Sequence, residues 1–268
     1  MKAETLGFSI APGGLLLPYH LGALDALDYH RVLSENTPIA GSSAGSIAVA
    51  AKACSMDSKQ VLENTIALSD ACRAMGGVAG RILPLVREQL EAHIGPNEWE
   101  AFQSRPGISG VAYKELLPRY RPILQTEFED KSDLINAVCH SSSFPFFGTL
   151  WPCSLDTSGK MPRLVVDGFF NVPRERFGCP EFELADVSVD RTVVICPYPQ
   201  ESICLTAVDP VDCICPTKQG SEQFGRLFRI ATEPSSREKL TELYDAGFTD
   251  AEAWCHTHLA KESALALN

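Results

Sequence analysis

Short apolar runs and helically spaced apolar positions alternate along the first part of the chain. Residues 6–10 alternate in the manner of a β-strand, and residues 37–40 form a second short apolar run. Between the two runs, leucines recur at the spacing of one helix face, at positions 17, 21, 24 and 27. The pattern predicts a β-α-β unit with parallel strands and a right-handed crossover. The loops that follow the two strands should therefore lie together at one edge of the sheet, where ligands bind in open α/β sheets.

The same two periodicities continue further along the chain. Helical spacing covers residues 57–74, 81–93 and 133–140. Short strands fit residues 107–128, and a β-branched run at 163–166 predicts a later strand. At 268 residues the chain is long enough to bury a large core. We therefore expect an α/β fold with a mostly parallel central sheet, followed by C-terminal helices.

The Gly-Ser-Ser-Ala-Gly sequence at residues 41–45 fits G-x-S-x-G, the strand-to-helix turn that presents a nucleophilic serine. Gly41 and Gly45 are needed because the serine backbone is strained and a Cβ two residues to either side would collide across the turn. The motif predicts Ser43 as a nucleophile. The alternative is an ordinary loop of small residues, because motifs of five residues also occur by chance.

The first strand runs into a loop with few side chains, Ala-Pro-Gly-Gly at residues 11–14. Attack of a serine on an ester carbonyl creates an oxyanion, which preorganised backbone N–H groups stabilise by several kcal/mol. We predict that the amides of Gly13, Gly14 and Ala44, the residue that follows Ser43, form this oxyanion hole. Pro12 cannot contribute because it has no N–H. A plain strand-to-helix turn is the alternative reading of the two glycines.

The later β-branched strand ends in Asp167-Gly168. A serine hydroxyl is weakly nucleophilic until a base removes its proton, and Asp167 is a candidate for that base. Asp-Gly is also a common hairpin turn, which is the structural alternative.

A Ser-His-Asp esterase of the α/β-hydrolase type would instead use a later histidine, in the chain order Ser, Asp, His. His256 and His258 satisfy that order formally. However, only one β-α unit precedes Ser43, and the i, i+2 spacing of the two histidines sends them to different helix faces. A dyad of Ser43 and Asp167 fits the sequence better than a triad.

Composition excludes several classes of function. The net charge is −11, which argues against a nucleic-acid partner and against electrostatic docking on anionic membranes. Any lipid contact should therefore be apolar and local. We see no secretory signal and no run of about 18 apolar residues, so we expect a cytoplasmic protein without a spanning helix. The ten cysteines read as reduced thiols, and neither their spacing nor Cys255-His256-Thr257-His258 resembles a zinc site, so no metal is expected.

Three blocks of the chain together resemble the patatin-like phospholipase family. They are residues 11–22, residues 41–45, and Val166-Asp167-Gly168 with Asn171 and Pro173 following. Residues 196–205 and 227–250 look like the animal-type branch that includes adiponutrin and the adipose triglyceride lipases. The resemblance spans nearly the whole chain, but few residues between positions 60 and 125 can be matched to the family with certainty.

The resemblance implies a three-layer α/β/α sandwich and hydrolysis of lipid esters by a Ser-Asp dyad, without a metal or cofactor for the chemistry. Residues 1–220 would form the catalytic domain and residues 221–268 a helical extension packed on or appended to it. The substrate would be an acylglycerol or a phospholipid. Lipid class, sn-position, oligomeric state and regulation stay open, and association with a membrane or lipid droplet would be peripheral.

Three positions depart from the family pattern, and one of them is Phe169, which follows Gly168 where the family usually has another small residue. Pro12 and Leu17 stand where the family's G-x-G-x-x-G has its first and last glycines. Loss of one oxyanion donor lowers the rate by about 10²–10³ if that donor is used. The alternative function is therefore a weakly active or inactive lipid-binding protein with the same fold.

Apolar stretches flank the proposed site in the sequence, at residues 15–17, 144–147 and 169–170. They fit either the core or an acyl channel. Phe224, Leu227, Phe228 and Ala231 form the apolar stripe of an amphipathic helix, which would pack on the sheet or touch a lipid surface.

Overall fold

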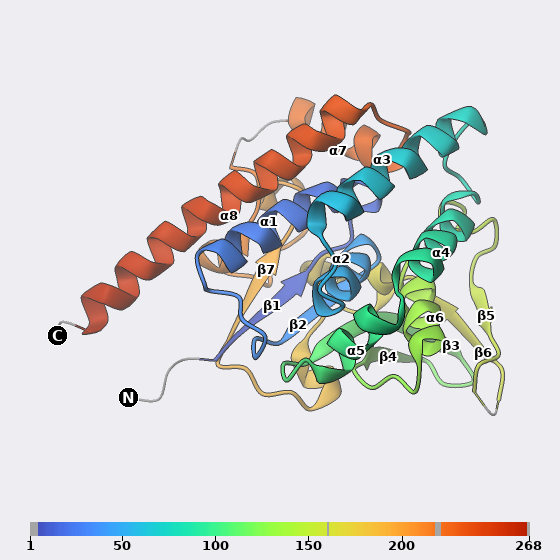
Figure 1. Ribbon diagram of the computed structural model, residues 1–268, viewed down its shortest axis with the longest axis horizontal. Coiled ribbons are helices and arrows are strands. Elements are labelled where there is room, and N and C mark those ends of the chain that lie inside the picture. Colours follow the sequence, from blue (N-terminus) through green and yellow to red (C-terminus); the bar gives the residue numbers. More distant parts are fainter. Residues whose placement is uncertain (1–4, 160, 218–220, 267–268) are drawn as a thin grey trace.

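The computed structural model describes residues 5–159, 161–217 and 221–266 of the chain. An eight-stranded sheet runs through its centre (Figure 1). The strands are β1 Leu6–Ile10, β2 Ile39–Ser42, β3 Ser109–Leu117, β4 Arg121–Gln125, β5 Ser154–Asp156, β6 Arg163–Val166, β7 Arg191–Ile195 and β8 Cys213–Ile214. The α-helices are α1 Leu17–Tyr29, α2 Ala44–Ala53, α3 Ser58–Ala74, α4 Ile82–His93, α5 Pro96–Ser104, α6 Lys131–Ser141, α7 Ser221–Thr232 and α8 Arg237–Ala266.

The predicted β-α-β unit forms the middle of the sheet. β1 pairs in parallel with β2, with Phe8 opposite Ile39, and β7 pairs in parallel with the other edge of β1. The strand order is β5-β6-β3-β2-β1-β7-β8, with β4 paired to β3. β4 and β6 run antiparallel to β3, and β5 runs antiparallel to β6. The α/β class and the mostly parallel sheet are therefore confirmed. The loops after β1 and β2 lie at the same edge, because the two strands are parallel.

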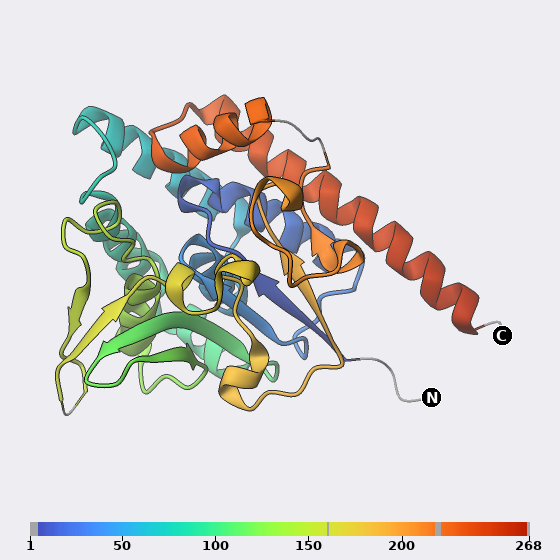
Figure 2. The same cartoon turned by 180° about the vertical axis from the view of Figure 1, so that it is seen from behind.

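The three layers of the molecule are unequal. Figure 1 shows the α-helices in front of the sheet, and Figure 2 shows short helical turns over part of its other side. The residues on that side include the 3-10 turns Gly168–Phe170, Arg174–Arg176 and Phe182–Ala185. The buried Phe182 ring packs there with Ala40 and Ala112, and the Ser9 hydroxyl donates to the Pro180 carbonyl at 2.8 Å. Compact turns rather than long helices thus cover this face.

The C-terminal helix α8 runs along α1 (Figure 1). A glycine on each helix permits this close approach: a Cβ at Gly22 would lie 2.0 Å from the Tyr244 carbonyl oxygen, and a Cβ at Gly247 would lie 2.0 Å from that of Tyr19. The Tyr19 hydroxyl also donates to Asp250 Oδ2 at 2.8 Å. Among the described residues, no helix is both long enough and apolar enough to span a bilayer.

We expect Gly247→Ala to destabilise the protein. The added methyl group has no room against the backbone of α1, and such overpacking lowers the free energy of unfolding by about 1–3 kcal/mol. Gly225→Ala in α7 is the matched control, because a Cβ there meets nothing within 4 Å. The control should be neutral or more stable by up to about 1 kcal/mol, since alanine favours helix over glycine. Thermal and urea unfolding measure both variants, and equal stability of the two would contradict the packing argument.

Candidate active site

Ser43 occupies a strained turn between β2 and α2. Its backbone has φ 53° and ψ −122°, a conformation that residues other than glycine rarely adopt. The flanking glycines permit this turn for a steric reason. A Cβ at Gly41 would lie 2.3 Å from the Gly45 carbonyl oxygen, and a Cβ at Gly45 would lie 2.4 Å from that of Ile10. The G-x-S-x-G motif thus forms the sharp strand-to-helix turn that the sequence predicts.

Hydrogen bonds from a distant helix hold this turn. The Ser43 N–H donates to the Ser141 hydroxyl oxygen at 2.8 Å, and that hydroxyl donates to the Ala112 carbonyl at 2.6 Å. The Ser46 hydroxyl donates to the Ser43 carbonyl at 2.7 Å. Ser141 is fully buried at the end of α6 and links the turn to β3. A serine at the end of a helix carries no local signal of such a role, so the sequence does not point to Ser141.

Asp167 follows β6 and lies on the same cavity as Ser43. Its side chain is fully buried, and Oδ1 accepts the Phe169 N–H at 2.8 Å. Oδ2 has no hydrogen-bond partner of normal length among the described residues. Burial raises the pKa of the carboxyl from 3.8 to about 7, and the Phe169 N–H and the nearby Ser43 hydroxyl limit this rise. Such a carboxylate can accept a proton near neutral pH.

The turn after Asp167 packs tightly against the end of β2. A Cβ at Gly168 would lie 2.4 Å from the Ala112 carbonyl oxygen and 2.7 Å from Cβ of Ser42. Only glycine fits at this position. The close packing of Gly168 places the preceding residue, Asp167, next to the serine turn. Asp167-Gly168 is therefore no hairpin turn: it leads into a 3-10 turn, Gly168–Phe170.

The glycine loop after β1 lines the same cavity through Pro12, Gly13 and Gly14. The N–H groups of Gly13 and Gly14 donate no hydrogen bond within the described part of the chain. Ala44 is the first residue of α2, and the N-terminal amides of a helix have no intrahelical acceptor. All three predicted donors thus have N–H groups available for an anion. Gly14 has φ 56°, and a Cβ there would lie 2.4 Å from the Ala231 carbonyl oxygen of α7.

The histidines occupy other places. His20 is buried in α1 beneath Gly13, and burial lowers the pKa of its ring to about 3, so the ring is neutral. The His256 ring lies 5.0 Å from the His30 ring, and the His258 ring stacks on Trp254 at 4.8 Å. No histidine is among the described residues that line the cavity of Ser43 and Asp167.

The cavity around Ser43 has a volume of about 310 Å³ and is mostly apolar. Aromatic rings form a continuous wall, each about 5 to 6 Å from the next. The rings belong to Phe144, Phe169, Phe177, Tyr198, Phe224 and Phe228. The apolar stretches predicted near the site have two different places. Phe144, Phe147 and Phe169 line the cavity. Leu15 and Leu16 are buried in the core. The helix α7 buries Leu227 and Ala231 and closes one side of the cavity with Phe224 and Phe228.

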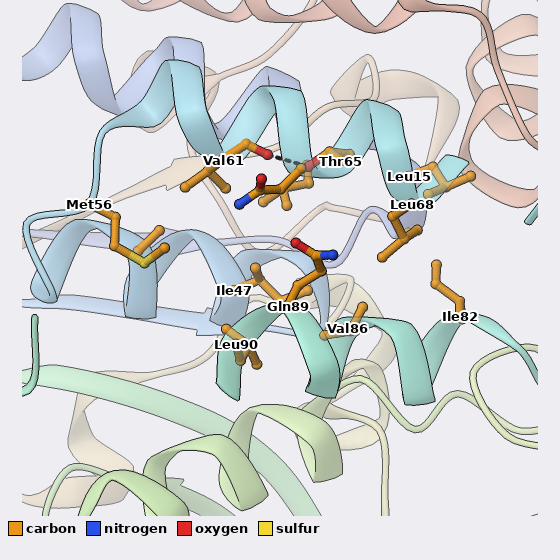
Figure 3. Close-up of a pocket in the computed structure, with 14 residues that line it drawn as sticks. Leu15, Ile47, Met56, Val61, Thr65, Leu68, Ile82, Val86, Gln89 and Leu90 are labelled. Atoms are coloured by element: carbon orange, nitrogen blue, oxygen red, sulfur yellow. Dashed lines mark hydrogen bonds between the residues drawn. The ribbon is translucent and has the colours of Figure 1, made fainter. Parts of the chain in front are cut away.

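A second, smaller cavity of about 70 Å³ lies between α2, α3 and α4 (Figure 3). Its walls are mainly aliphatic, and the polar side chains Asn64, Thr65 and Gln89 also reach it. Gly14 borders both cavities. The described lining of this second cavity holds no serine, histidine, cysteine or carboxylate, whereas Ser43 and Asp167 both line the larger one.

Comparisons with known proteins assign neither a family nor an activity. No family model matches the sequence, and no curated protein matches it. Among solved structures, VipD from Legionella pneumophila superposes with a TM-score of 0.47 at 10% identity, over 96% of this chain and 67% of that one. The heterodimeric ExoU–SpcU complex from the type III secretion system of Pseudomonas aeruginosa gives a TM-score of 0.41 at 16% identity. The matched region is 92% of this chain and about half, 52%, of the other.

Replacing the buried carboxyl should stabilise the fold in a pH-dependent way. The folded protein holds the Asp167 proton up to about pH 7, whereas an unfolded chain releases it near pH 3.8, so raising the pH between these values favours unfolding. Asp167→Asn does not titrate. Its melting temperature should exceed that of the wild type by a margin that grows from pH 4 to pH 7 and then levels off.

Thermal unfolding across this pH range measures the effect, and Asp70→Asn, an exposed aspartate on α3, is the control. A margin for Asp167→Asn that is independent of pH would show that the carboxyl has no raised pKa.

Proposed function

We propose that this chain is a patatin-like lipid acyl hydrolase that cleaves carboxylic esters of acylglycerols or phospholipids. The observation that supports this most is a single arrangement: a strained serine and a fully buried aspartate with a pKa near 7 share an apolar cavity with free backbone amides. Within the family, the stretches at residues 196–205 and 227–250 resemble the animal-type branch. We therefore expect acylglycerol or phospholipid esters at a lipid surface rather than soluble substrates.

In the proposed mechanism, Ser43 Oγ attacks the ester carbonyl and Asp167 takes the hydroxyl proton. The carbonyl oxygen becomes an oxyanion, which the N–H groups of Gly13, Gly14 and Ala44 stabilise. The alcohol of the lipid leaves with a proton from Asp167, and an acyl-enzyme remains on Ser43. Asp167 then removes a proton from water, whose oxygen attacks the acyl carbon. The bond to Ser43 Oγ breaks, the fatty acid leaves, and Asp167 returns the proton to Oγ. This scheme needs the carboxylate form, which is present above about pH 7.

The dyad is favoured over a triad because the histidines of this chain lie elsewhere. The sequence offers His256 and His258 as candidates for a triad. The His256 ring contacts His30 and the His258 ring contacts Trp254, and both contacts lie outside the cavity. The carboxylate of Asp167 instead faces the cavity that Ser43 lines.

A lipid-binding protein without activity is the second candidate function, and Pro12 is the observation that favours it. Pro12 lines the cavity and offers no N–H, so an oxyanion hole that required an amide at this position would be incomplete. Two glycine amides and the start of α2 nevertheless remain available. We therefore favour hydrolysis.

A lipid surface would meet the molecule beside the aromatic wall. The loop after α6 exposes Phe146 and Trp151, whose exposed fractions are 66% and 72%, and its neighbours Phe144 and Phe147 line the cavity. Phe146 has φ 61°, a backbone conformation that bulky residues rarely adopt. Phe228 of α7 is 54% exposed at another part of the cavity wall. We propose these residues as the local, apolar contact with a membrane or droplet.

Ser43→Ala should abolish hydrolysis of lipid esters, and Asp167→Asn should lower kcat by at least about a hundredfold, the contribution of a general base. Both variants should stay folded, because neither substitution adds volume. His258→Ala should keep its activity in the same assay of fatty-acid release from acylglycerol and phospholipid vesicles. Loss of activity in His258→Ala with retention in Asp167→Asn would establish the triad instead.

Labelling with a fluorophosphonate separates the enzyme from the inactive lipid-binding protein. The wild type should react, because the probe needs an activated serine, and Ser43→Ala should not. A wild type that binds vesicles but neither reacts with the probe nor gains turnover through Pro12→Gly would overturn the hydrolase proposal.

Phe146→Ala combined with Trp151→Ala should weaken binding to lipid vesicles and slow hydrolysis of vesicle substrates. Neither side chain lines the cavity, so turnover of a soluble short-chain ester should change little. Vesicle co-sedimentation and the two assays measure these effects, with the exposed Val211→Ala as control. Equal losses on both substrates would indicate damage to the site rather than a surface contact.

A further inference from the structure

Three side chains that commonly bind metals converge where the end of α1 meets α8. His30 follows the last residue of α1, and Glu252 and His256 lie one turn apart on α8. Their ligand atoms all lie within 4.8 Å of one another. The His30 and His256 rings meet edge to face with centroids 5.0 Å apart. In the described part of the chain, no other group of three His, Cys, Asp or Glu side chains meets this criterion.

The spacing fits a shared metal ion better than a direct hydrogen bond. His30 Nε2 lies 3.5 Å from Glu252 Oε1, beyond the usual length of an N–H···O bond. Two ligands of one tetrahedral zinc ion, each about 2.0–2.1 Å from the metal, are about 3.3 Å apart. His30 Nε2 is also buried and has no hydrogen-bond partner among the described residues. A buried imidazole nitrogen that makes no hydrogen bond of normal length is costly unless something binds it.

Packing holds the two sides of this group in place. Glu252 and His256 share a helix face because their spacing is i, i+4. Gly22 and Gly247 each allow the backbone of the other helix to approach closely, which holds α8 against α1. The ring of Tyr29 packs on that of His30 at 5.2 Å. These contacts keep the three side chains on neighbouring helix surfaces, with their ligand atoms within 4.8 Å of one another. The group does not overlap with the lining of the Ser43 cavity.

We propose that His30, Glu252 and His256 bind one zinc-class divalent metal ion that clamps α8 onto α1, with water as the fourth ligand. Two imidazoles and one carboxylate form a typical ligand set for zinc. The sequence did not reveal the site, because His30 lies more than two hundred residues before Glu252 and His256 and the ligands include none of the ten cysteines. The site is structural and independent of the proposed hydrolysis, so neither proposal depends on the other.

Metal titration of the untagged, full-length, reduced protein tests the proposal. Zn²⁺ should bind with a stoichiometry of one per chain in isothermal calorimetry and raise the melting temperature, because a ligand of the folded state stabilises it. Co²⁺ should give the visible absorption bands of a four-coordinate site without a thiolate charge-transfer band, which separates this site from the cysteines. His256→Ala and His30→Ala should lose this ion and the thermal shift, and Glu252→Gln should weaken both.

His93→Ala is the control, since it removes a histidine on α4 that bonds the Gln89 carbonyl and belongs to no such group. It should bind Zn²⁺ like the wild type. His256 is exposed, so its alanine variant should match the metal-free wild type in circular dichroism and melting temperature. Failure of the wild type to bind Zn²⁺ would overturn the proposal. So would binding that survives in His256→Ala, or a cobalt spectrum that shows thiolate ligation.

Discussion

The close backbone contact between the serine turn and the end of β1 is the constraint on which the rest of the site depends. Gly45 fits only because it lacks a Cβ that would meet the Ile10 carbonyl oxygen at 2.4 Å, and Gly41 fits against Gly45 for the same reason. Within this tight turn Ser43 has a positive φ, and it lines the cavity. The strain persists because Ser141 binds the Ser43 N–H and the parallel strands fix both loops at one edge.

In the proposed hydrolase, the low polarity of the cavity affects both the chemistry of Asp167 and the stability of the fold. The same apolar surroundings that suit an acyl chain exclude water from Asp167 and raise its pKa to about 7. A carboxyl of ordinary pKa would be a poor base for a serine hydroxyl, whereas this one accepts a proton near neutral pH. The fold carries the free-energy cost of a buried carboxyl whose second oxygen finds no partner of normal length among the described residues. Such a cost is common at functional sites.

The C-terminal helices complete the site rather than merely following it. α7 closes the aromatic wall and approaches Gly14 so closely that a Cβ there would meet the Ala231 carbonyl oxygen at 2.4 Å. α8 in turn packs along α1, which begins directly after the glycine loop. Contacts that hold α8 in place therefore also support the loop that would bind the oxyanion. The group formed by His30, Glu252 and His256 lies on this same interface, at the far end of α1.

Local sequence patterns determined the elements and the form of the turns. Periodicity predicted the β-α-β unit and most helices, because a residue's exposure follows from its position on one helix or strand. The glycines around Ser43 and after Asp167 could be interpreted in advance, since the steric need for glycine is local.

Only the tertiary structure decided which distant groups meet. Ser141 supports a turn 98 positions earlier in the chain, and 3-10 turns cover the second face of the sheet. Burial sets the pKa of Asp167, and α8 brings His256 to His30. These features depend on contacts between segments far apart in the sequence, and no local spacing encodes such contacts.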